Sequence, residues 1–185
     1  MTMSQRCWNA FKHGEVCEKN TSTQLSYLAY DPRSIVVFMT GGCAWSQRYR
    51  HIQAVFGISF GPNSYRNISS YVPHKYSQCK EIAELFAVSA TLRHILEIVV
   101  TNQITLPVST VVICTCSLEI EAVITNPRWS KFRSQIWMRT WGHRYLLRDV
   151  LERVEQLEGM GLEIVVALTP PYCTAESYKL LPPIF

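Results

Sequence analysis

The sequence lacks the features of a membrane protein and of a disulfide-stabilised secreted protein. No apolar run approaches the ~20 residues that a membrane-spanning helix needs. Residues 1–20 are polar and mixed, without the charged and apolar regions of a secretory signal. The seven cysteines are odd in number and irregularly spaced, which does not match a disulfide framework. We therefore expect an intracellular protein, cytoplasmic or nuclear, with reduced thiols and no membrane partner.

A usual metal-ligand spacing is also missing from the N-terminal segment. Cys7, His13 and Cys17 lie close together in the sequence, but nothing nearby completes a set of four ligands. The first apolar strand, predicted at residues 34–44, ends in Gly41-Gly42 with no carboxylate, histidine or lysine. A double glycine after a β-branched run predicts a tight turn that something approaches closely. This strand end carries little of the chemistry that a catalytic sheet edge usually presents.

The chain of 185 residues, 48% of them hydrophobic, is long enough for one compact domain with a buried core. Residues 1–33 show no clear period, and we expect an N-terminal extension packed on a domain that spans 34–185. Apolar periodicity predicts the remaining elements. The first expected strand lies in the stretch 34–44 and breaks into a turn at Gly41-Gly42. The other expected strands are 51–60, 64–70, 110–115 and 162–168, and the expected helices are 80–100, 118–124 and 145–157. This order predicts a mixed five-stranded α/β sheet, with a three-strand antiparallel meander plus parallel strands, flanked by helices.

Five short pieces of the chain, in this order, resemble the ribonuclease H family in the form common in fungal proteins. They are residues 31–37 leading into Thr40-Gly41-Gly42-Cys43, residues 54–62 with 65–69, Ala83-Glu84-Leu85, residues 113–117, and residues 147–151. The resemblance runs from about residue 31 to residue 176. It implies the ribonuclease H fold, and it implies hydrolysis of the RNA strand of an RNA–DNA hybrid by two Mg²⁺ ions held by four carboxylates.

Carried over residue by residue, the family's four carboxylates fall on Gly41, Glu84, Cys116 and Glu176. Only Glu84 and Glu176 are acidic, and a cysteine thiol is a soft ligand that Mg²⁺ does not favour. The resemblance therefore predicts a degenerate catalytic motif, no Mg²⁺ cofactor and no two-metal nuclease activity. Glu84 is either a surviving ligand or a polar residue at a helix–sheet junction. Cys116 is either a nucleophile or a structural thiol.

Residues 128–148 combine cations with flat aromatic side chains. Positive residues outnumber negative ones here, and arginine beside tryptophan suits contact with phosphates, sugars and bases. The alternative is a solvated basic face over core tryptophans. The candidate nucleic-acid-binding residues are Arg128, Trp129, Lys131, Arg133, Trp137, Arg139, Trp141, Arg144 and Arg148. Gln78 and Cys79 lie where the family often places residues that contact the minor groove of the hybrid.

Three classes of function remain from the sequence. The leading interpretation is a non-catalytic module that binds an RNA–DNA hybrid or another nucleic acid. The first alternative is a protein-interaction scaffold, with a protein partner or a homodimer. The second is a cleft converted into a small-molecule pocket for new chemistry. An active hybrid ribonuclease is the interpretation that the replaced carboxylates favour least.

Overall fold

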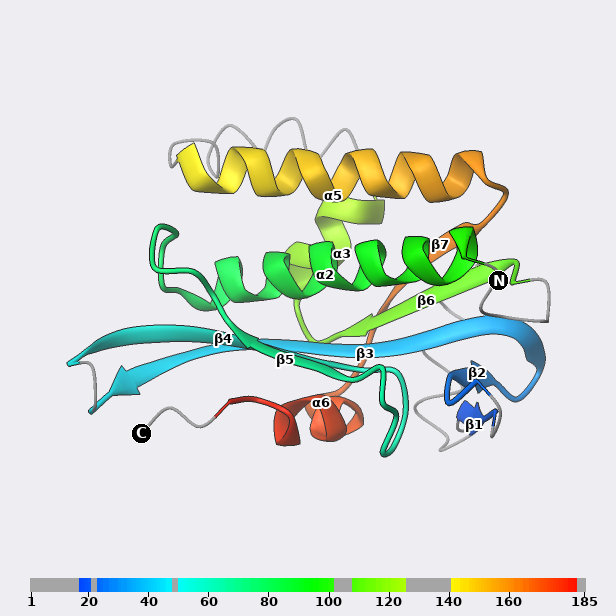
Figure 1. Ribbon diagram of the computed structural model, residues 1–185, viewed down its shortest axis with the longest axis horizontal. Coiled ribbons are helices and arrows are strands. Elements are labelled where there is room, and N and C mark those ends of the chain that lie inside the picture. Colours follow the sequence, from blue (N-terminus) through cyan, green and yellow to red (C-terminus); the bar gives the residue numbers. More distant parts are fainter. Residues whose placement is uncertain (1–16, 21–22, 48–49, 102–107, 126–140, 183–185) are drawn as a thin grey trace.

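The computed structural model describes residues 17–20, 23–47, 50–101, 108–125 and 141–182. Their strands form one seven-stranded sheet with two long helices on one face and a short helix on the other (Figure 1). The strands are β1 (Cys17–Lys19), β2 (Ser26–Leu28), β3 (Asp31–Ser46), β4 (His51–Ser59), β5 (Ile68–Tyr71), β6 (Thr110–Thr115) and β7 (Glu163–Leu168). The helices are α2 (Lys80–Val100), α3 (Leu118–Thr125), α5 (Trp141–Gly159), the 3₁₀ turn η1 (Pro171–Thr174) and α6 (Ala175–Lys179).

The sheet combines an antiparallel path with a parallel pair of strands. Strands β1 to β5 follow one another in antiparallel order. Strand β6 then pairs in parallel with the first half of β3, and β7 pairs in parallel with β6. The expected fold class is confirmed, and the short strands β1 and β2 extend the sheet beyond the five strands predicted. Both lie within residues 1–33, where three-residue strands are too short to show a period.

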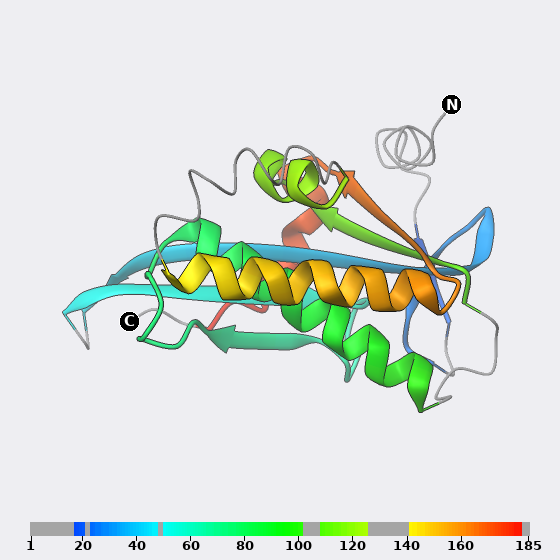
Figure 2. The same cartoon turned by 90° about the horizontal axis from the view of Figure 1, so that it is seen from above.

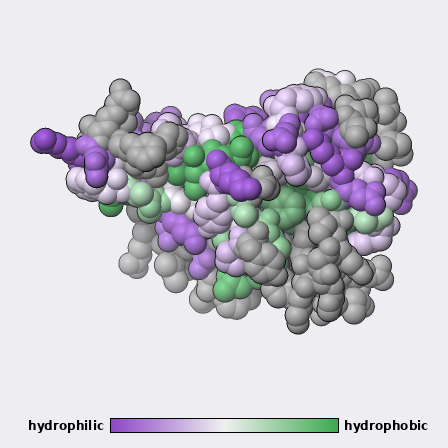
Figure 3. All heavy atoms as spheres, turned by 90° about the horizontal axis from the view of Figure 1, so that it is seen from below, coloured by the Kyte–Doolittle hydropathy of each residue, from purple (hydrophilic) through white to green (hydrophobic). Residues whose placement is uncertain are grey.

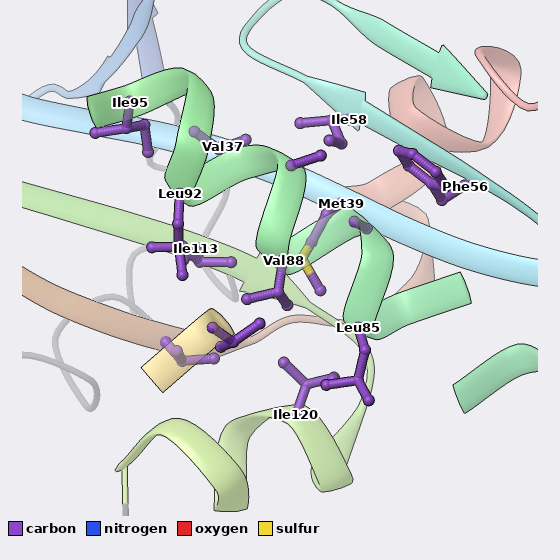
Figure 4. Close-up of a cluster of buried hydrophobic side chains, with 14 of the residues drawn as sticks. Val37, Met39, Phe56, Ile58, Leu85, Val88, Leu92, Ile95, Ile113 and Ile120 are labelled. Carbon is purple, nitrogen blue, oxygen red and sulfur yellow. The ribbon is translucent and has the colours of Figure 1, made fainter. Parts of the chain in front are cut away.

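The core lies between the sheet and helix α2. Side chains from β3, β4, β6, α2 and α3 point toward one another there (Figure 4). Every residue of β6 is buried, as expected for a strand covered on both faces. Helix α5 packs on α2, and the two views place it over the sheet on the same side (Figure 2). None of the helices in the described part of the chain combines the length and apolar content needed to cross a membrane.

Two predicted boundaries are wrong. Strand β3 continues through Gly41-Gly42 to Ser46, because Gly41 pairs with Phe56 and Gly42 with Val55 in the ladder with β4. Neither glycine adopts a positive φ, so their backbones are extended strand and not a turn. The third strand begins at Ile68 and not at residue 64, since residues 61–67 form a loop held by Asn67. Its side-chain oxygen accepts a hydrogen bond from the Phe60 amide at 2.8 Å.

Candidate functional site

Gly41 marks the point where helix α2 approaches the sheet most closely. A Cβ atom built on Gly41 would lie 2.5 Å from the Glu84 amide nitrogen and 2.8 Å from the Ala83 carbonyl carbon. Real Cβ atoms do not approach backbone atoms this closely, so the space beside β3 is already filled by the helix. The glycine is therefore needed for helix packing, and it brings Gly41 and Glu84 into direct contact.

Glu84 is a buried carboxylate between the helix and the sheet. Its side chain is 4% exposed, and the Lys80 Nζ lies 3.6 Å from its Oε1, one turn earlier in α2. Burial raises the pKa of Glu84, and interactions with Ser117 and Lys80 only partly offset that effect. Among the described residues, Lys80 is the cation that pairs with the Glu84 carboxylate, and its ammonium lies on one side of that carboxylate.

Lys80 has anionic or polar neighbours from three elements. Glu84 is the largest cause that raises the pKa of Lys80, and Cys116 and Tyr178 add smaller contributions of the same sign. Cys116 follows the end of β6, and Tyr178 belongs to α6. Of the positions predicted to correspond to the family's carboxylates, the contacts join Gly41 to Glu84 and Glu84 to Lys80.

The fourth position, Glu176, lies in the short helix α6, and its side chain is outside the described part of the structure. The helix itself packs on the opposite face of the sheet from α2 (Figure 1). The Ser177 carbonyl oxygen takes the place that a Cβ of Gly57 would need on β4. Glycines thus permit close helix packing on both faces, at Gly41 for α2 and at Gly57 for α6.

Ser117 connects the site to helix α3. Its hydroxyl donates to Glu119 Oε2 at 3.2 Å and accepts from the Ile120 amide at 3.4 Å, near the start of that helix. Glu119 itself is exposed. No group of three or more His, Cys, Asp or Glu side chains suited to a metal ion occurs within the described ranges.

Gln78 has a structural role that the sequence interpretation missed. Its Oε1 accepts hydrogen bonds from the Ala54 amide at 2.9 Å and from Gln53 Nε2 at 3.1 Å. Its Nε2 donates to the carbonyls of Pro73 and Tyr76 at 3.1 and 3.0 Å. The side-chain amide of Gln78 thus uses its oxygen and its nitrogen in hydrogen bonds that stabilise the loop before α2. These bonds argue against a minor-groove contact by this side chain. Burial raises the pKa of the neighbouring Cys79 thiol, which keeps it protonated near neutral pH.

Most of the candidate nucleic-acid-binding residues lie outside the described residues. These are Arg128, Trp129, Lys131, Arg133, Trp137 and Arg139, and the side chain of Trp141. Arg144 and Arg148 are exposed on the first turns of α5. The Arg148 guanidinium lies 5.7 Å from the centre of the Tyr145 ring, and its Nε is 3.3 Å from Glu152 Oε1.

Sequence reasoning missed Lys80 and Ser117 as members of the site. Lys80 precedes Glu84 by four residues, a spacing that places both side chains on one helix face, so this pair was detectable. Ser117 carried no comparable signal, because it belongs to a different element, between β6 and α3.

Comparisons with protein-family models and with curated protein sequences give no match. Among solved structures 22 chains match. The prototype foamy virus protease-reverse transcriptase superposes with a TM-score of 0.52 at 16% identity, over 78% of this chain and 20% of that chain. This chain thus spans about a fifth of that viral protein.

Two smaller neighbours are similar over most of their own length. The PFV RNase H domain aligns at 16% identity with a TM-score of 0.49, over 78% of this chain and 87% of that one. LC11-RNase H1, solved in complex with RNA/DNA hybrid, aligns at 12% identity with a TM-score of 0.45, over 78% and 91%. The strand order and the helices on both faces of the sheet give the chain a mixed α/β fold of the ribonuclease H-like type.

Proposed function

We propose that this chain is a nucleic-acid-binding module on a ribonuclease H-like scaffold that does not cleave its ligand by a two-metal mechanism. The observation that carries the proposal is the contact between Gly41 and helix α2. Position 41 offers no side-chain oxygen and has no space for a side chain, because the Glu84 amide already lies there.

The remaining described groups do not fit a pair of magnesium ions. Two such ions need several oxygen ligands around them. Here Glu84 is buried beside the Lys80 ammonium, and the thiol of Cys116 is a poor magnesium ligand. The Lys80 ammonium near the carboxylate repels divalent cations, so the local charge also opposes metal binding. No step of a metal-assisted reaction is assigned to these residues.

Residues 128–148 support the binding half of the proposal. Their arginines and lysine attract the phosphate backbone, and their interleaved aromatics suit stacking on bases or sugars. The small-molecule alternative has less support, because the space beside Gly41 is taken by the helix backbone. A protein-interaction scaffold would not require the basic composition of residues 128–148, so it has less support than nucleic-acid binding. The experiment below includes a result that would favour it.

The test compares cleavage and binding on the same oligonucleotides. Purified protein is incubated with an RNA–DNA hybrid, duplex RNA, and single-stranded RNA and DNA, with Mg²⁺ or with EDTA. We expect no cleavage, and binding that EDTA leaves unchanged but that weakens steeply between about 50 and 200 mM salt. An Arg133→Gln variant should bind less tightly, whereas Arg33→Gln, an exposed arginine at the start of β3, should bind like the wild type.

A second variant tests the lost metal site directly. Gly41→Asp combined with Cys116→Asp restores the family's acidic residues in sequence, but we expect no Mg²⁺-dependent cleavage because an aspartate at position 41 collides with α2. Cleavage by the wild type would overturn the non-catalytic half of the proposal. Absence of all nucleic-acid binding, together with a stable homodimer or a co-purified protein, would replace it by the scaffold function.

A further inference from the structure

Four chain segments meet at one end of the molecule, which we call the hairpin end. The end of β3, the start of β4, the loop between β5 and α2, and the first turns of α2 and α5 all lie at the left of Figures 1 and 2. The β3–β4 hairpin projects beyond both helices there. Because the two views agree, these segments are neighbours in space although they are far apart in sequence.

The hairpin end collects exposed cations. The described ones are Arg50, Lys75, Lys80, Arg144 and Arg148. The described acidic residues near them are Glu81, the buried Glu84 beside Lys80, and Glu152 beside Arg148. Seen from the α6 side, hydrophilic side chains occupy the left tip of the molecule, where the hairpin turns (Figure 3). This end therefore presents mainly positive charge to the solvent.

The opposite end of the same helices is acidic. Helix α2 has Glu97 in its last turn, α5 ends after Glu155 and Glu158, and β7 begins with Glu163, all of them exposed. The exposed Arg33 at the start of β3 lies at this end too, but the four glutamates outnumber it, so the charge here is more negative than at the hairpin end. A polyanion is attracted to the hairpin end and repelled from the other end, which orients it before contact.

Trp45 and Ile52 form an exposed apolar pair on this hairpin. They are direct partners in the β3–β4 ladder, so both side chains lie on one face of the sheet. Alternation along β3 places Trp45 on the same face as Gly41, beyond the start of α2. Trp45 is 60% exposed and Ile52 is 49% exposed. A tryptophan this exposed beside a second apolar side chain indicates a surface that meets a partner.

We propose that the hairpin end binds single-stranded nucleic acid, with Trp45 stacking on an unpaired base and the surrounding cations contacting phosphates. The proposal rests on the proposed function and names its ligand class. Charge complementarity selects a polyanion. The aromatic ring selects an unpaired strand, because the faces of bases inside a duplex are covered by their neighbours.

The first experiment measures anisotropy of labelled oligo(dT) and of a labelled DNA duplex of similar length at low salt. Trp45→Ala should weaken oligo(dT) binding about tenfold, because stacking on one base is lost. Trp45→Phe should recover most of the affinity. Tyr65→Ala removes a tyrosine that is 72% exposed in the loop between β4 and β5, away from the hairpin end, and should change nothing. Duplex binding should be unaffected by Trp45→Ala.

The second experiment tests the phosphate contacts. Arg50→Gln should reduce the slope of log K against log salt by about 0.7 for oligo(dT), since one phosphate contact is lost. Arg33→Gln, with an exposed arginine at the other end of β3, should leave the slope unchanged. Thermal unfolding of each variant checks that these exposed substitutions leave the fold intact.

The outcomes separate this inference from the proposed function. If the wild type binds nucleic acid with a steep salt dependence and Trp45→Ala binds equally well, the hairpin end is not the site, while the proposed function stands. If the wild type binds no nucleic acid, both fall. If Trp45→Ala instead dissociates a dimer in solution scattering and leaves oligonucleotide binding unchanged, the surface is a protein interface and the inference is wrong.

Discussion

Gly41 lies so close to Glu84 that a Cβ atom on the glycine would stand 2.5 Å from the glutamate's amide nitrogen. This contact joins the middle of β3 to the second turn of α2. It determines how deeply the helix sits on the sheet, and it buries the Glu84 carboxylate at 4% exposure. Helix position and carboxylate burial therefore have one common cause at residue 41.

Gly41→Ala should destabilise the fold. The added methyl group meets helix backbone, which cannot rotate away, and overpacking of this kind costs about 1–3 kcal/mol. Gly42→Ala is the matched control, because its Cβ would meet only Leu181 Cδ1 at 3.9 Å, an ordinary contact. Urea denaturation of both variants measures the difference. Equal stability of the two variants would show that α2 sits farther from β3 than described here.

Glu84→Gln should make the protein progressively more stable than the wild type as the pH rises from about 4 to 7. The raised pKa of Glu84 means that the folded state binds this proton more tightly than the unfolded chain does. The loss of folding stability caused by the buried charge is absent below the pKa of Glu84 in the unfolded chain. It grows as the pH rises from that pKa through the higher pKa of Glu84 in the folded state. The neutral amide avoids this cost at every pH. Parallel stability curves for variant and wild type would contradict the burial of a charged Glu84.

The sequence predicts a helix or strand well where the burial of its side chains determines it, and poorly where backbone contacts with other segments do. The helix at 80–100 and the strand at 110–115 agree with α2 and β6, because apolar periodicity directly reflects which face is buried. The continuation of β3 through Gly41-Gly42 was missed. There the ladder with β4 holds the strand through backbone hydrogen bonds, and the glycines serve the approach of a helix.

The candidate site was predictable only in part, for a similar reason. The family resemblance predicted Gly41 and Glu84 as members of one site, and in the structure Gly41 lies against the backbone of Glu84, whose carboxylate pairs with Lys80. It gave no information on the distance between α2 and β3. Helix α6, only five residues long, packs on β4 at Gly57, a contact between segments about 120 residues apart that no local pattern encodes.

Asp149→Ala should cost about 1–3 kcal/mol of stability, since its carboxylate connects α5 to α2 through hydrogen bonds that involve a charged group. Ser89 Oγ donates to Asp149 Oδ2 at 2.5 Å, and Arg153 donates to Oδ1 from Nε and Nη2 at 3.0 and 2.8 Å.

Glu152→Ala is the matched control on the same helix. It removes an exposed pair with Arg148, which is expected to contribute about 0.5 kcal/mol or less. Chemical denaturation of the two alanine variants compares them. A loss at Glu152 as large as the loss at Asp149 would show that the α2–α5 contact does not depend on the Ser89–Asp149–Arg153 network.

His94→Gln should reduce the loss of stability that the wild type shows on acidification below about pH 6.5. His94 is half-buried on α2, with its ring centre 5.0 Å from the ring centre of Phe60 in an edge-to-face arrangement, and burial followed by the charge of Arg66 lowers its pKa. The unfolded chain therefore binds this proton at a higher pH than the folded chain does. Stability falls as the pH drops from the unfolded pKa through the folded one, because the neutral imidazole is the form that the fold accommodates. Thermal unfolding of wild type and variant between about pH 5 and 8 measures this difference. A wild-type curve that runs parallel to that of His94→Gln would show that the imidazole is protonated as readily in the fold as in water.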